Sequence, residues 1–123
     1  MKNVHKLMAV FFAAVLLSGC ATKAFVSTEK YLEFVGNPTT GYTWILSNSN
    51  EDIVFVEEDI KYMGKDDIVG APSMFFYKFI SQKPGESIVK FEYKRPWEEK
   101  EAQNIRTYKV IVKESGKMSL KEL

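Results

Sequence analysis

Residues 87–94 read SIVKFEYK, in which apolar and charged side chains alternate. Because successive side chains of a β-strand point to opposite faces, Val89, Phe91 and Tyr93 would share one face and the three charged side chains the other. The apolar face would pack in a core, and the charged face would be exposed to water. The same alternation recurs in residues 105–113, where the inward side chains would be Tyr108, Val110 and Val112.

The rest of the chain from Thr22 onward is a series of short runs rich in Val, Ile, Phe, Tyr and Thr, separated by turn residues. The sequence shows no heptads, internal repeats or low-complexity segments, and the pattern is typical of an all-β protein. A turn at residues 82–85, with Pro84 and Gly85, predicts a hairpin between the fourth and fifth of the clearer strands. We predict a short strand near Phe25 and six clearer ones at residues 30–36, 42–47, 53–62, 73–80, 87–94 and 105–113.

This series of strands predicts the fold class. Six or seven short strands within about a hundred residues favour two packed antiparallel sheets, an immunoglobulin-like β-sandwich of about seven strands. Trp44 would lie in its core, because it follows a tight turn in an early central strand. A domain of this size can bury a core without disulfide bonds, and the single cysteine of the chain allows none within it.

The start of the chain is expected to be a secretory signal peptide over residues 1–19. Lys2, His5 and Lys6 give a positive start, and an uncharged apolar run of about eleven residues follows at 7–17. A helix needs roughly twenty apolar residues to cross a bilayer. A cleaved signal is therefore a better interpretation than a permanent transmembrane anchor.

The signal ends in Leu17-Ser18-Gly19-Cys20, which resembles the lipobox of bacterial lipoproteins. The resemblance implies that Cys20 becomes the acylated first residue, with residues 20–27 as a lipid-anchored segment; the alternative is a buried or free thiol. Each buried lipid methylene adds about 0.8 kcal/mol of membrane affinity. We expect secretion across the inner membrane and lipid anchoring to the cell envelope, and Ala21, in place of a retaining aspartate, favours the outer membrane.

Removal of residues 1–19 would also limit the chemistry of the mature chain, because His5 is the one histidine and Cys20 the one cysteine. Ser-His-Asp or Cys-His catalysis and zinc sites of the usual Cys/His kind need side chains that would then be missing. Loss of Lys2 and Lys6 lowers the 17 basic residues to 15, against 16 acidic ones. This near-neutral balance argues against nucleic-acid binding, and we expect no enzyme, no cofactor and no metal.

Two stretches between the strands are more specific than ordinary connections. Residues 37–42 read NPTTGY, and taken alone they form a turn in which Pro38 fixes φ and Gly41 permits a positive φ. Residues 95–97 read RPW, which places a tryptophan in a loop. Trp97 either folds back onto the edge of the sandwich or stays exposed as a binding hot spot, a role for which tryptophan is favoured.

Together these motifs resemble the signature loops of the chagasin family of cysteine protease inhibitors, with a similarity that spans residues 28–113 of a predicted domain at 28–123. The resemblance implies a wedge of three loops at one end of an immunoglobulin-like sandwich. The middle loop departs from the family's glycine-rich pattern, because Gly70 alone matches it cleanly and Pro72 removes a backbone donor; the alternative is a simple connection. The residues implied to contact the protease are Asn37, Pro38, Thr39, Thr40, Gly41, Tyr42, Gly70, Ala71, Pro72, Ser73, Arg95, Pro96 and Trp97.

The resemblance also implies a mechanism. A papain-like protease binds an extended peptide in a cleft that holds a thiolate and an imidazolium, and the first loop would fill that cleft with Thr39 nearest the catalytic pair. Trp97 would lie on the primed side and residues 70–73 along the unprimed side, while Arg95 would brace its own loop. We expect tight, reversible, non-covalent inhibition of cathepsin L-like or endogenous enzymes by a monomer.

Two other functions are open at this point. An adhesive or structural immunoglobulin-like envelope lipoprotein would have the same anchor and fold, but it would not account for two matching loops. An enzyme would depend on a cluster of carboxylates, and such clusters are usually solvated surface. The carboxylates concerned are Glu57, Glu58, Asp59, Asp66 and Asp67.

Overall fold

The computed structural model describes residues 24–64 and 70–123. The predicted signal peptide, the predicted lipidation site Cys20 and the carboxylates Asp66 and Asp67 lie outside the described residues. Among the residues that it describes, no helix has the length and apolarity needed to cross a membrane.

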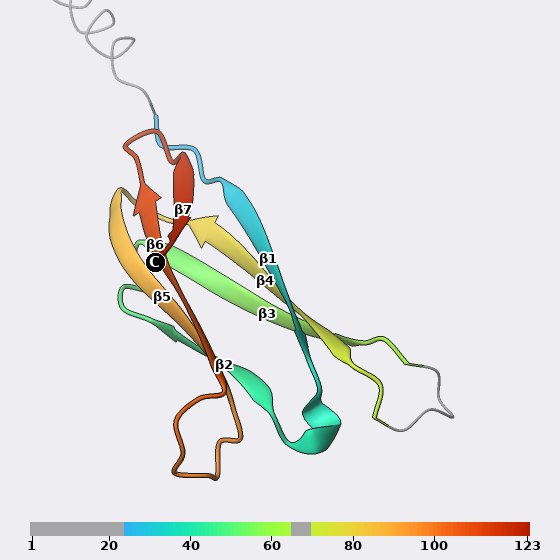
Figure 1. Cartoon of the computed structure of the whole chain (residues 1–123). Coiled ribbons are helices and arrows are strands. Elements are labelled where there is room, and N and C mark those ends of the chain that lie inside the picture. The colour runs from blue at the N-terminus through green and yellow to red at the C-terminus, as the bar shows by residue number, and fades with distance from the viewer. Residues whose placement is uncertain (1–23, 65–69) are drawn as a thin grey trace, which may run out of the picture.

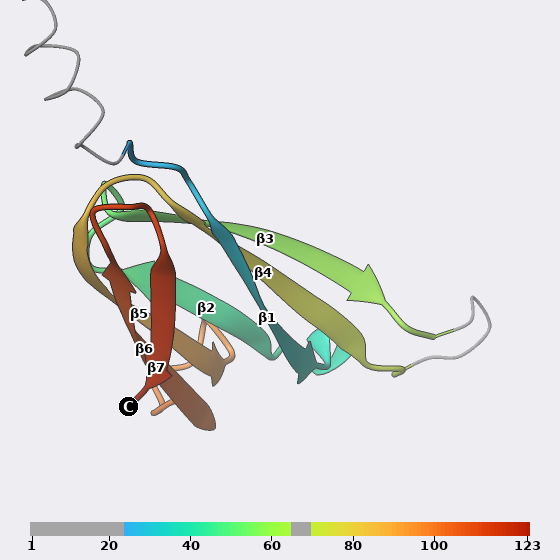
Figure 2. The same cartoon turned by 90° about the horizontal axis from the view of Figure 1, so that it is seen from above.

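Seven strands and one short 3-10 helix, η1, form the described chain (Figure 1). The strands pair antiparallel into a three-stranded sheet, in the order β1-β4-β3, and a four-stranded sheet, in the order β2-β5-β6-β7. The two sheets pack against each other (Figure 2), which confirms the predicted immunoglobulin-like sandwich. The bounds are β1 Glu29–Gly36, η1 Pro38–Thr40, β2 Thr43–Asn48, β3 Val54–Tyr62, β4 Ser73–Ser81, β5 Gly85–Lys94, β6 Asn104–Val112 and β7 Met118–Glu122.

A cluster of aromatic rings joins the two sheets. Measured between ring centroids, Phe34 of β1 lies 4.8 Å from Trp44 of β2 and 4.9 Å from Phe91 of β5, and Tyr77 of β4 lies 4.6 Å from Phe91. All four side chains are buried, and each such pair contributes about 0.5–1.5 kcal/mol beyond burial alone. The predicted core position of Trp44 is therefore confirmed, although its strand lies at the edge of the four-stranded sheet and not, as predicted, at its centre. The buried positions predicted for five other residues are confirmed as well, namely Val89, Phe91, Tyr108, Val110 and Val112.

The predicted hairpin between the fourth and fifth clear strands is wrong. The turn at residues 82–85 exists, but it leads from β4 in one sheet to β5 in the other. The inward side chains of the two strands face each other across the core, as Tyr77 and Phe91 do, so the strands cannot be neighbours in one sheet. A Pro-Gly turn permits either connection, and its residues alone do not distinguish them.

The seventh strand lies at the C-terminal end of the domain and not near Phe25, where we predicted it. The backbone around Phe25 has no strand ladder and is held by single contacts, such as the bond from the Val26 amide to the Ser115 carbonyl at 2.9 Å. The place of the missing strand is taken by β7, which pairs with β6 and buries Met118. The described N-terminal residues lie at one end of the sandwich, and the loop at 37–42 lies at the other (Figure 1).

Candidate functional site

The first loop, residues 37–42, connects β1 in one sheet to β2 in the other. The Thr40 amide donates to the Asn37 carbonyl at 3.1 Å and the Gly41 amide to the Pro38 carbonyl at 2.9 Å, so the backbone closes into η1. Pro38 stands at the start of this helix, where a backbone N–H would have no partner within the helix, so the N–H that proline lacks is not needed. Because the side chains of Pro38, Thr39 and Thr40 are exposed, the tip is a compact projecting turn.

Asn37 holds the first loop through both its backbone and its side chain. Its carbonyl accepts a hydrogen bond from the Thr40 hydroxyl at 2.6 Å, and its Oδ1 accepts one from the Thr39 hydroxyl. Its Nδ2 donates to the carbonyl of Gly70 at 3.0 Å, which connects the first loop to the middle loop. Both threonine hydroxyl protons point back to Asn37, so the tip offers oxygen lone pairs and methyl groups to a partner.

Gly41 ends the turn in the left-handed region, with φ at +87°, which glycine adopts without strain. Trp97 of the third loop packs on this glycine through its six-membered ring, and a Cβ added at Gly41 would collide with that ring. The Trp97 side chain is nevertheless 69% exposed. Trp97 therefore rests on the first loop and is not buried in the sandwich.

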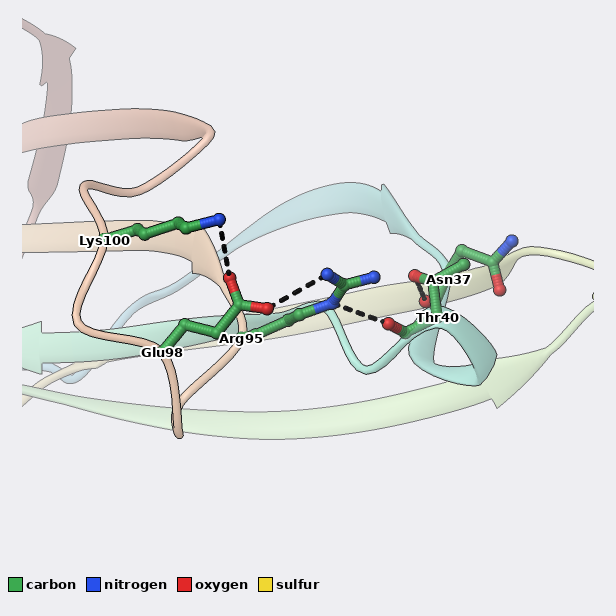
Figure 3. Close-up of polar contacts among 5 residues, drawn as sticks. All are labelled: Asn37, Thr40, Arg95, Glu98 and Lys100. Atoms are coloured by element: carbon green, nitrogen blue, oxygen red, sulfur yellow. Dashed lines mark hydrogen bonds and ion pairs between the residues drawn. The ribbon is translucent and has the colours of Figure 1, made fainter.

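Arg95 ties the third loop to the first (Figure 3). Its Nε donates to the Thr40 carbonyl at 2.9 Å, and its Nη1 donates to Oε1 of Glu98 at 3.0 Å. Its guanidinium also lies 4.5 Å from the centroid of the Tyr42 ring, and Lys100 approaches the other oxygen of Glu98 at 3.9 Å. Arg95 thus braces its own loop, as the resemblance implied, and the first loop as well.

Tyr93, the penultimate residue of β5, lies at the base of the loops. Its hydroxyl accepts a hydrogen bond from the Asn37 amide at 2.8 Å. Its ring stacks on Tyr42 at a centroid distance of 5.3 Å and an interplanar angle of 21°, and it contacts Trp44 at 5.0 Å. The sequence pattern identified Tyr93 only as an inward residue, and it did not assign Glu98 a role. No sequence signal pointed to the bond between Tyr93 and Asn37, which are 56 positions apart, whereas the opposite charges of Arg95 and Glu98, three positions apart, could have indicated their ion pair.

The middle loop begins and ends in the described residues, although part of it lies outside them. Gly70 has a φ of +86° and nothing within 4 Å of where a Cβ would stand. At the base, the Pro72 carbonyl accepts a hydrogen bond from the Met63 amide at 3.0 Å. Ala71 is half-buried, and Ser73 is buried as the first residue of β4.

A hollow of about 400 Å³ lies at the bases of the three loops. At this hollow the Tyr93 hydroxyl holds the Asn37 amide by the direct hydrogen bond described above. The residues that line it are Val35, Gly36, Asn37, Trp44, Pro72, Tyr93, Gln103 and Asn104.

The carboxylates on β3 do not converge on a reaction centre. Glu58 accepts a hydrogen bond from the hydroxyl of Tyr77 at 2.6 Å, and burial together with this bond raises the pKa of Tyr77. Because side chains alternate along a strand, Glu57 and Asp59 point to the other side of the sheet. In the described ranges, no three His, Cys, Asp or Glu side chains are grouped so as to hold a metal ion.

Comparison with known proteins places these loops in a family context. The family model described as "Chagasin family peptidase inhibitor I42" matches residues 26–112. Amoebiasin-2 of Entamoeba histolytica is 32% identical over 79 residues, which cover 63% of this chain and 64% of that protein, so the match spans less than two thirds of its length. The crystal structure of the cysteine protease inhibitor EhICP2 from the same organism superposes with a TM-score of 0.61 at 30% identity, over 69% of this chain and 78% of that one.

Proposed function

The chain belongs to the chagasin family of peptidase inhibitors, and from this membership we propose that it inhibits papain-like cysteine proteases by filling their active-site cleft. The observation that carries the proposal is the bonding of the three loops into one unit. Asn37 bonds to the middle loop, Arg95 bonds to the first loop, and Trp97 packs on Gly41.

The first loop suits the bottom of a papain-like cleft, which holds a thiolate and an imidazolium. Thr39 stands at the exposed tip, and its hydroxyl proton is already donated to Asn37. Its oxygen therefore remains as an acceptor, which an imidazolium N–H could use. We propose Thr39 as the residue nearest the catalytic pair.

The same loop is a poor substrate. A protease of this class binds its substrate as an extended strand, whereas residues 38–40 form a 3-10 helix closed by two backbone hydrogen bonds. Cleavage would require the turn to extend, which would break these two bonds, and the hydrogen bond from Arg95 to the Thr40 carbonyl opposes that extension. The loop can therefore occupy the cleft without presenting a peptide bond in the register that the enzyme cleaves.

Trp97 and the middle loop would contact the enzyme on either side of the cleft. The exposed indole of Trp97 has the large, rigid surface of a typical binding hot spot. Residues 70–73 would lie along the unprimed side. Three such loops can supply the roughly 1,600 Å² that a stable complex buries.

Affinity would come largely from preorganisation. Loops that are already bonded to one another lose little conformational entropy when they dock, so more of the contact energy appears as binding. The hydrogen bonds that Asn37 and Arg95 donate to the neighbouring loops supply this order in the free protein. We therefore propose tight, reversible and non-covalent inhibition.

The position of the first described residues fits a tethered inhibitor. The first described residues lie at the end of the sandwich opposite the first loop (Figure 1). If Cys20 is acylated, as its lipobox-like setting predicts, the loops would point away from the membrane and toward a protease in solution.

Steady-state inhibition tests the proposal. Residues 21–123 should inhibit papain or a cathepsin L-like enzyme at nanomolar concentration, remain uncleaved after long incubation, and leave trypsin active. The absence of inhibition of several papain-like enzymes at micromolar concentration would refute the proposal and favour an adhesive envelope lipoprotein.

A further inference from the structure

We infer that Tyr93 is a positioning residue for the inhibitory tip: its hydroxyl sets the place of the first loop, although it lies at the base and not at the tip. The inference rests on the proposed function, because it concerns how the wedge is held ready to enter a cleft. It goes beyond the loop motifs, because Tyr93 belongs to β5 and its role follows from contacts that only the folded chain forms.

Tyr93 contacts the first loop at both of its ends. At the start, the hydroxyl accepts the hydrogen bond of the Asn37 amide at 2.8 Å. At the end, the ring stacks on Tyr42 with a centroid distance of 5.3 Å, and its other neighbour is the buried Trp44. One rigid side chain, itself fixed against the core, therefore spans the base of the loop.

The bond from Tyr93 to Asn37 crosses from one sheet to the other. Asn37 follows β1 in the three-stranded sheet, whereas Tyr93 belongs to β5 in the four-stranded sheet. Packing on Tyr42 and Trp44 fixes the Tyr93 ring, and its hydroxyl meets the Asn37 amide beside the hollow of about 400 Å³ that both residues line. The hydroxyl therefore defines how far the start of the loop stands from the opposite sheet.

A displacement of Asn37 would move the other loop residues with it. The Asn37 carbonyl accepts from both the amide and the hydroxyl of Thr40, its Oδ1 accepts from the Thr39 hydroxyl, and its Nδ2 donates to the Gly70 carbonyl. The position of Asn37 thus determines those of the tip and of the middle loop. This is the route by which Tyr93 acts on residues that it does not touch.

The test is Tyr93→Phe in the full chain, kept in mild detergent, because this change removes the hydroxyl and retains the stacking ring. The loss of one hydrogen bond that orders the loop should weaken papain inhibition roughly 3- to 10-fold. The melting temperature should stay nearly unchanged, since water in the hollow can accept from the freed Asn37 amide. Tyr31→Phe is the matched control: its hydroxyl bonds to Glu29, both side chains are exposed, and its removal should leave inhibition unchanged.

Two readouts separate positioning from a general structural role. Hydrogen exchange of the Thr40 and Gly41 amides, which close η1, should accelerate in Tyr93→Phe and not in Tyr31→Phe. In a double-mutant cycle, Tyr93→Phe and Thr39→Ala should be non-additive for inhibition, as expected of residues that act through one unit.

The outcomes distinguish the inference from the proposed function. Unchanged inhibition and unchanged exchange in Tyr93→Phe would overturn the positioning role while the inhibitor proposal stands. If the unaltered chain fails to inhibit papain, the proposed function fails, and the exchange rates alone then decide whether Tyr93 orders the loop.

Discussion

At the scale of single residues, the least expected feature is an exposed tryptophan that is held in place. Trp97 is 69% exposed, yet its six-membered ring rests on Gly41. The sequence indicated two alternatives, a residue folded onto the sandwich edge or a free hot spot. The structure shows an intermediate arrangement, in which the indole packs on a neighbouring loop and keeps most of its surface accessible.

Trp97→Ala should separate binding from stability. If Trp97 is a hot spot, its truncation should weaken inhibition by about 2–4 kcal/mol, or roughly 30- to 1,000-fold. Thermal unfolding should be nearly unchanged, because little of the side chain is buried. A loss of several kcal/mol of stability, as for a large core residue, would contradict this assignment. Trp44→Ala serves as the contrasting core variant.

The motif residues could be predicted from the sequence, but most of their partners could not. The run at 37–42 identified the turn, because proline and glycine impose their backbone preferences locally. The role of Tyr93 could not be predicted, because its hydrogen bond with Asn37 depends on how distant parts of the chain pack. The opposite charges of Arg95 and Glu98, three residues apart, were a local signal of their ion pair. Local chemistry is visible in a sequence, whereas partners 56 positions apart are visible only in the fold.

At the scale of elements, the three loops act as one packed unit, and Gly41 lies at the contact between two of them. Gly41→Ala would introduce a Cβ at a φ of +87° and push Trp97 away. We expect about 1–2 kcal/mol of backbone strain, altered near-ultraviolet circular dichroism from Trp97, and clearly weaker inhibition.

Gly70→Ala provides the matched comparison. Gly70 has nearly the same φ, +86°, but nothing lies within 4 Å of its added Cβ. The backbone strain should be similar to that in Gly41→Ala, but the near-ultraviolet circular dichroism of Trp97 should not change. If both variants left the Trp97 spectrum unaltered, the packing of Trp97 on the first loop would be wrong.

Strands were predictable where a run of apolar and aromatic residues is bounded by turn residues, as at 73–80, which matches β4 to one residue. The strand at 87–94 agrees with β5 nearly throughout, because core and solvent faces alternate along it. The strand β7 was missed because it is short and follows a charged turn, and only Met118 is buried in it. The connection from β4 to β5 was misassigned because a turn motif does not reveal which sheet the next strand joins.

At the scale of the whole molecule, the first described residues and the first loop lie at opposite ends (Figure 1). The lipobox-like end of the predicted signal predicts a lipid on Cys20. Cys20→Ser should therefore abolish fatty-acid labelling and release the protein from the membrane fraction, while the soluble form keeps its inhibitory activity. A variant that stays labelled and membrane-bound would exclude Cys20 as the anchor.

The central claim is that the first loop occupies the cleft above the catalytic thiol of a papain-like enzyme. The most direct measurement is the rate at which iodoacetamide alkylates that thiol in papain mixed with residues 21–123, followed by intact mass spectrometry. We predict protection at a one-to-one ratio, its loss when Thr39 is replaced by lysine, and recovery of full activity after dissociation. An alkylation rate equal to that of free papain, at concentrations where the two proteins form a complex, would contradict the claim.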